Sequence, residues 1–211
     1  HEPTMALLRN ALEAADNSDK LNRQKTYERL ANYLYLTMTA KKGTRSRIYA
    51  EEHKKEFTHI IRSYYPDKFR FDLKKQNPLG MWVNWLTTAG DYEASVRVFE
   101  DSLSRMEKSF DTAKNINLLE GIIKSYLALG REKQAETWIN RIDTSITNDL
   151  NKDKLNEPPI AFLRILLNIC EYKYDEGKKT GAKRYIDKLH TVLAVTGKEI
   201  DGKALYKYFS D

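Results

Sequence analysis

The stretch LLEGIIKSYLALGREKQAETWINRI, residues 118–142, decides the fold. Before its turn, apolar residues such as Ile122 and Tyr126 recur at spacings of three and four, the period of a helix with one buried side. Gly130 then supplies the backbone freedom for a tight turn, and the small Ala135 lies about one turn into the next segment. Because a small residue lets two helices approach closely, the stretch predicts a pair of antiparallel helices joined at the glycine.

The same spacing between a glycine and a small residue recurs on both sides of this stretch. Gly177 is followed five residues later by Ala182, and Gly90 by Ser95. Apolar residues at helical spacing flank each pair. The pattern therefore predicts three helical hairpins, near residues 78–108, 115–148 and 159–195.

The central stretch resembles the tetratricopeptide repeat family. Tyr126, Gly130 and Ala135 stand in the places of that family's large aromatic, turn glycine and small alanine, and the resemblance extends over residues 78–197. It departs from the family in two ways. The turn glycines are 40 and then 47 residues apart, rather than the roughly 34 of the family, and Lys173 replaces the aromatic of the third hairpin.

This resemblance implies a fold and a kind of function. The fold is a right-handed superhelix of antiparallel helix hairpins, an α-solenoid, and the family uses its concave groove to hold a peptide or a protein helix. The groove-lining positions correspond here to Asn84, Glu120 and Lys124. Their alternative role is that of ordinary exposed polar residues. The implied function is a non-catalytic interaction module, in a more specific version the scaffold or sensing part of a larger signalling protein.

A second resemblance points to RNA. The stretch AGDYEASVRVFEDSLSRM, residues 89–106, also resembles the pentatricopeptide repeat family. That family reads bases through a small polar residue ten positions before the turn glycine, and those positions are Gly80, Glu120 and Leu167 here. The base-reading pattern is not met. Binding to a nucleic-acid backbone through basic residues remains the alternative function.

The rest of the chain predicts further helices. Glycine and proline are scarce and alternating β-branched runs are absent, so the whole chain is expected to be all-α, with seven to nine helices. Ser18 or Asp19 is expected to cap the second helix. We expect one continuous domain with N-terminal helices in residues 1–77, three hairpins in 78–197 and a capping helix in 198–211. The ranges for the N-terminal part are helices at 3–15, 21–40 and 44–64 and an irregular basic connection at 67–78.

Positive charge is concentrated in one segment. The chain has 211 residues and a formal net charge of +6, and residues 41–75 hold eleven Lys or Arg against five Asp or Glu, a difference that accounts for all six charges. A localised basic surface can attract phosphate groups, anionic lipid or an acidic protein, or it can be a solvated helix face. The candidate contacts for an anionic partner are Lys41, Lys42, Arg45 and Arg47.

The sequence contains no recognisable catalytic motif. Glycine-rich phosphate loops and zinc-site spacings are absent, and His53 and His59, six residues apart, lie on different sides of a helix. Cys170 follows an apolar pattern that favours a small buried residue over a nucleophile. Trp82 and Trp85 could form an aromatic ligand platform or fill the core. We therefore expect no enzyme activity, no cofactor and no metal.

The compartment and the oligomeric state stay open. A single cysteine suits either the reducing cytosol, slightly favoured, or a periplasm without disulfides. No signal peptide is recognised at the start of the sequence, which opens on His1 and could carry a tag remnant or a processing scar. No apolar run is long enough to insert into a membrane.

Overall fold

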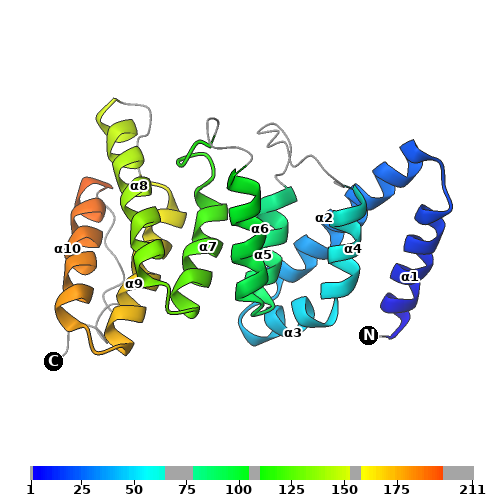
Figure 1. The fold of residues 1–211 in the computed structure, drawn as a ribbon, viewed down its shortest axis with the longest axis horizontal. Helices are drawn as coiled ribbons and strands as arrows, with labels where there is room; N and C mark the ends of the chain where they lie inside the picture. Colours follow the sequence, from blue (N-terminus) through cyan, green and yellow to red (C-terminus); the bar gives the residue numbers. More distant parts are fainter. Residues whose placement is uncertain (1, 65–77, 105–109, 153–157, 197–211) are drawn as a thin grey trace. The chain divides into compact units, whose positions relative to one another are not determined.

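The computed structural model describes residues 2–64, 78–104, 110–152 and 158–196, in which the chain forms ten α-helices and no strand. The all-α prediction is confirmed, and the helices exceed the expected seven to nine. The predicted capping helix at 198–211 and nearly all of the basic connection at 67–78 lie outside the described residues. Figure 1 shows α1 Glu2–Asp16, α2 Lys20–Ala40, α3 Thr44–Glu52, α4 Lys54–Tyr64, α5 Pro78–Thr88, α6 Tyr92–Ser104, α7 Ile116–Ala128, α8 Glu132–Asn151, α9 Ile160–Asp175 and α10 Lys179–Thr196.

The helices group into two compact units that divide between Ser102 and Leu103. The first unit holds α1 to α5 and nearly all of α6, and the second holds α7 to α10. The first predicted hairpin is therefore packed with the N-terminal helices in one unit. The predicted division of the chain at residues 77 and 197 stays a prediction.

Asp19 begins α2, which settles the choice of cap left open by the sequence. Its carboxylate accepts hydrogen bonds from the backbone amides of Leu21 at 3.0 Å and Asn22 at 3.1 Å. The hydrogen bond from the Asn22 amide is the largest of several that lower the pKa of Asp19. Ser18 instead donates to the Ala15 carbonyl at the end of α1. The cap satisfies amides that have no partner within the helix.

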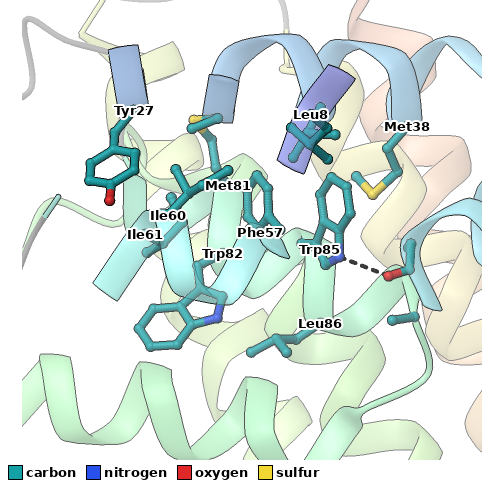
Figure 2. Close-up of a cluster of buried hydrophobic side chains, with 14 of the residues drawn as sticks. Leu8, Tyr27, Met38, Phe57, Ile60, Ile61, Met81, Trp82, Trp85 and Leu86 are labelled. Carbon is teal, nitrogen blue, oxygen red and sulfur yellow. Dashed lines mark hydrogen bonds between the residues drawn. The ribbon is translucent and has the colours of Figure 1, made fainter. Parts of the chain in front are cut away.

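The predicted single helix over residues 44–64 is wrong, because the chain breaks at His53 into α3 and α4. The indole N–H of Trp85 donates to the Ala50 carbonyl at 2.9 Å, as the dashed line in Figure 2 shows. In an unbroken helix this carbonyl would accept from the amide of Lys54. The tryptophan thus takes a backbone acceptor that a continuous helix would use, at the place where α3 ends and α4 begins.

Aromatic side chains fill the core of the first unit. The rings of Phe57 and Trp85 stack with their centroids 4.0 Å apart and their planes 9° apart. Figure 2 shows them among buried side chains from α1, α2, α4 and α5, including Leu8 and Met38. Trp82 is buried as well, with the Arg62 guanidinium 5.7 Å from its ring. Both tryptophans therefore fill the core, and truncating either to alanine should cost about 3–5 kcal/mol of unfolding free energy.

The three predicted hairpins are present and share one turn geometry. Gly90, Gly130 and Gly177 have φ angles of 78°, 67° and 69°, in the left-handed region. The amide after each glycine donates to the carbonyl five residues back, at 2.9, 2.8 and 2.8 Å, and the glycine amide donates three residues back, at 3.1, 3.0 and 2.9 Å. Both bonds together are the Schellman motif that closes a helix at a glycine. The predicted role of the turn glycines is confirmed.

The small residues five positions after the glycines lie at the contact of the two helices. Ser95 and Ala135 are fully buried and Ala182 nearly so. The Ser95 hydroxyl also lies 2.9 Å from that of Thr87 and 3.3 Å from the Val83 carbonyl, so a polar side chain is satisfied at this position of the first hairpin. Close helix approach thus explains why each position carries a small side chain.

The second unit is built around α9, which contacts α7, α8 and α10. Figure 1 shows these four helices side by side, with α7 and α9 running in the same direction. Their enclosed side chains are Leu119, Ile122, Ile123, Ile139, Ile142, Phe162, Ile165, Leu166 and Ile169. Each such side chain stabilises the folded state by roughly 1.5–3 kcal/mol.

Candidate interaction surfaces

The three predicted groove residues have different environments. Asn84 on α5 is half-buried and donates to the Tyr35 hydroxyl on α2 at 3.2 Å, a contact within the first unit. Glu120 and Lys124 are on α7 in the second unit. The structure therefore brings only the last two together, on one side of α7, and it gives Asn84 an internal partner.

Glu120 and Lys124 belong to a polar surface shared with α9. The Arg164 guanidinium on α9 donates to both carboxylate oxygens of Glu120, at 2.8 and 2.7 Å. One turn farther along both helices, Lys124 is exposed and Asn168 is half-buried. We call Glu120, Lys124, Arg164 and Asn168 the α7–α9 face. A paired carboxylate is a weak anchor for a basic ligand, so Lys124 is the charge that this face offers to a partner.

A cluster of charged groups ties α8 to α9 and α10, and the sequence analysis missed it. Lys173, whose side chain is 9% exposed, reaches the carboxylates of Glu132 and of Glu136, the latter at 2.6 Å. Lys178 pairs with Glu132 at 2.5 Å, and the Tyr185 hydroxyl donates to Glu136 at 3.2 Å. Each buried charge has an opposite partner, so the cluster holds the two hairpins together rather than offering a reactive group.

The pKa shifts of the cluster follow from these contacts. Hydrogen bonds from Lys173 and then Lys178 lower the pKa of Glu132. Burial acts to lower the pKa of Lys173, but its two carboxylate partners outweigh burial and raise it. Burial, with the neighbouring carboxylate, raises the pKa of Tyr185 to about 12. A Cβ at Gly181 would lie 3.0 Å from the Lys173 Cδ, so this glycine leaves room for the lysine stem. Two sequence features could have indicated this cluster: Lys173 stands where the repeat family has an aromatic residue, and Gly181 stands opposite it in the hairpin.

The four basic candidates divide into two pairs. The Lys41 Nζ lies 5.1 Å from the centre of the Tyr49 ring, and Arg47 pairs with Glu51 at 3.2 Å. Lys42 and Arg45 are exposed at the junction of α2 and α3. This second pair is therefore accessible to a partner. The basic residues at 68–75 lie outside the described residues.

Exposed apolar side chains adjoin the second pair. Tyr33 and Leu36 on α2 and Ile48 on α3 are 53%, 57% and 48% exposed. With Lys42 and Arg45 they form what we call the α2–α3 patch. The sequence analysis predicted its basic part and missed its apolar part.

The remaining candidates for a reactive or metal-binding role are Cys170, which is buried, and two histidines, His53 and His59, which lie in different surroundings. Cys170 is buried, its thiol faces the Ala182 carbonyl at 3.8 Å, and burial raises its pKa to about 12, which confirms the prediction of a small buried residue. Burial lowers the pKa of His53, while His59 is half exposed and lies 3.6 Å from Asp16. The two histidines thus have separate surroundings.

The described helices lack a metal-ligand cluster and a membrane-spanning segment. No group of three or more His, Cys, Asp or Glu residues in the described part of the chain is arranged to hold a metal ion. Among the same residues, no helix has the length and apolar character needed to cross a bilayer.

Comparisons with protein-family models, with curated proteins and with solved structures find no match to this chain.

Proposed function

We propose that this chain is a non-catalytic helical-hairpin module that binds a protein or a peptide, as the scaffold or sensing part of a larger signalling protein. The observation that carries the proposal is the equivalence of the turns at Gly90, Gly130 and Gly177, with the same two hydrogen bonds at each. Equivalent hairpins that stack side by side produce a superhelix with an extended binding surface. We propose a right-handed superhelix of this kind, similar to tetratricopeptide repeats, for the hairpins of this chain.

The α7–α9 face is the proposed groove surface of the second unit. Its side chains come from the first helices of two successive hairpins, and Lys124 is exposed on it. Since Glu120 is occupied by Arg164, a ligand carboxylate would meet the lysine without competition from that acid. A peptide with an acidic group and small polar residues suits this face.

A photo-crosslinking amino acid at position 124 tests this proposal in the full chain. The control carries the same group at Lys133, which is exposed on α8. We expect a protein partner that crosslinks through position 124 far more than through position 133, and that is lost in Lys124→Glu. Equal crosslinking at both positions would contradict the assignment of the face.

Backbone binding of RNA is the second candidate, favoured by the exposure of Lys42 and Arg45. It predicts that single-stranded RNA binds with an affinity that falls steeply with salt. Fluorescence anisotropy of a random RNA across a salt series tests it. Replacement of Lys41, Lys42, Arg45 and Arg47 by Ser would abolish such binding.

Catalysis is not part of the proposal. A thiol with a pKa of about 12 carries almost no thiolate at neutral pH, so Cys170 is a poor nucleophile. In the charged cluster around Lys173, each lysine is paired with a carboxylate. The proposed activity is therefore recognition by surface complementarity alone.

A further inference from the structure

We propose that the α2–α3 patch is a second docking surface, whose occupant is an acidic amphipathic helix of another protein. This inference rests on the proposed interaction function but uses a different surface, on the first unit. It starts from a clustering of exposed apolar side chains. Among the described residues six large apolar side chains are exposed, and three of them, Tyr33, Leu36 and Ile48, lie within one short stretch.

The three exposed apolar side chains lie on two helices that pack against each other, α2 and α3. Tyr49 on α3 is buried, the Lys41 Nζ at the end of α2 lies 5.1 Å from the centre of its ring, and burial is the main cause that raises the pKa of its hydroxyl. Ile48 precedes it on α3, and Leu36 follows Tyr33 by one helical turn. From this packing we infer that α2 and α3 present the three side chains on one surface. Scattered exposed apolar residues need no explanation, but a cluster of them favours a binding surface.

The charges around the cluster select the partner. From residue 29 to residue 50 the sequence carries Arg29, Lys41, Lys42, Arg45 and Arg47 and no Asp or Glu. The nearest acids on α3 are Glu51, which pairs with Arg47, and the exposed Glu52. Cations therefore border the apolar side chains with little compensation. A helix with an apolar stripe flanked by Asp and Glu is complementary to both features.

The side chains favour a protein helix over RNA or a membrane. Single-stranded nucleic acid gains affinity from stacking on several aromatic rings, and only Tyr33 among the three exposed side chains has a ring. Leu36 and Ile48 are aliphatic and offer no such platform. Membrane binding by an amphipathic helix needs a long apolar face, whereas the exposed side of α2 that carries Tyr33 also carries the exposed Arg29.

The test uses the full chain and a synthetic probe. The probe is a fluorescein-labelled peptide of about sixteen residues, about four helical turns, with Leu at positions i, i+3, i+4 and i+7 and Glu or Asp elsewhere. A second peptide replaces every acid by Lys. Single-stranded RNA and vesicles containing phosphatidylserine are measured in parallel. We expect saturable binding of the acidic peptide only.

Matched variants locate the binding. Leu36→Ser removes an apolar side chain that is 57% exposed, and its control, Leu21→Ser, removes one that is 59% exposed on the same helix. Loss of a partly buried leucine contact should weaken binding about tenfold. The exposed Lys42 and Lys25 form the second pair, and Lys42→Glu should weaken binding several-fold at low salt while Lys25→Glu should not.

The outcomes decide between the alternatives. The proposal holds if Leu36→Ser and Lys42→Glu weaken peptide binding while their controls do not, and if circular dichroism shows all variants folded. It is overturned if the acidic peptide does not bind, or if each control variant weakens peptide binding as much as the patch variant it is matched with. It is also overturned if RNA or vesicles bind and Leu36→Ser and Lys42→Glu weaken that binding. Crosslinking at Lys124 is independent of this surface, so its result separates failure of this inference from failure of the proposed function.

Discussion

Replacing Lys173 by Met should destabilise the second unit through its two carboxylate partners. The side chains of Glu132 and Glu136 are 21% and 32% exposed, and that of Lys173 is 9% exposed. Breaking a fully buried ion pair costs about 3–5 kcal/mol, while exposed pairs contribute about 0–1 kcal/mol. After the change Glu132 keeps Lys178 and Glu136 keeps the Tyr185 hydroxyl. Because these groups are only partly exposed, Lys173→Met should lower the unfolding free energy by an intermediate amount, about 2–3 kcal/mol at neutral pH.

The pH dependence of this loss has a definite sign. The folded pKa of Glu132 is below its ordinary value of 4.5. Its ionised form therefore stabilises the folded state above that value, and this contribution disappears as the pH falls through the folded pKa. Lys173→Met removes the largest cause of the shift. The difference in unfolding free energy between wild type and variant should thus be full at neutral pH and shrink as the solution is acidified below 4.5.

Urea denaturation followed by circular dichroism measures the effect at several pH values. Lys183→Met is the control, because Lys183 is exposed on α10 and its replacement should change stability by less than about 0.5 kcal/mol. In Lys173→Met/Glu136→Gln part of the loss should be recovered, since the uncompensated carboxylate is gone. A Lys173→Met protein as stable as the control at neutral pH, or a deficit that does not change in acid, would refute this reasoning.

Further predictions concern the turns, the core and the thiol. Gly130→Ala should cost about 1 kcal/mol in urea denaturation, because the left-handed backbone is strained for alanine although nothing lies within 4 Å of the new Cβ. Trp85→Phe should cost about 2–4 kcal/mol through lost volume and the lost bond to the Ala50 carbonyl, and hydrogen exchange should rise around His53. Asp19→Ala should cost about 1 kcal/mol as a lost cap. Cys170 should react with a thiol reagent only after denaturant is added.

Local features of this fold were predictable from the sequence, because their causes are local. The turns at Gly130 and Gly177 and the cap at Asp19 depend on residues within a few positions, and they lie where the spacing indicates. The break at His53 has a distant cause, because the indole of Trp85 donates to the Ala50 carbonyl across 35 residues of sequence. No pattern within residues 44–64 marks it. A sequence pattern therefore extends the helix through the break.

Charged contacts between hairpins were unpredictable for the same reason. The partners of Lys173 are 41 and 37 residues away in sequence, and Glu120 meets Arg164 across 44 residues. Which acids reach which bases depends on how hairpins pack. The sequence could indicate only that Lys173 departs from an aromatic position.

The proposed α2–α3 patch lies partly on a helix that the sequence predicts correctly. Tyr27, Leu34 and Met38 recur at helical spacing along α2, and all three are buried. Tyr33 and Leu36 lie on the other side of the helix, so α2 is apolar on two sides. The spacing of apolar residues identifies the buried side of a helix, but it gives no role to apolar residues on the opposite side. An amphipathic helix with an additional outward apolar pair beside uncompensated cations is better explained by a partner that covers it than by the core of its own unit.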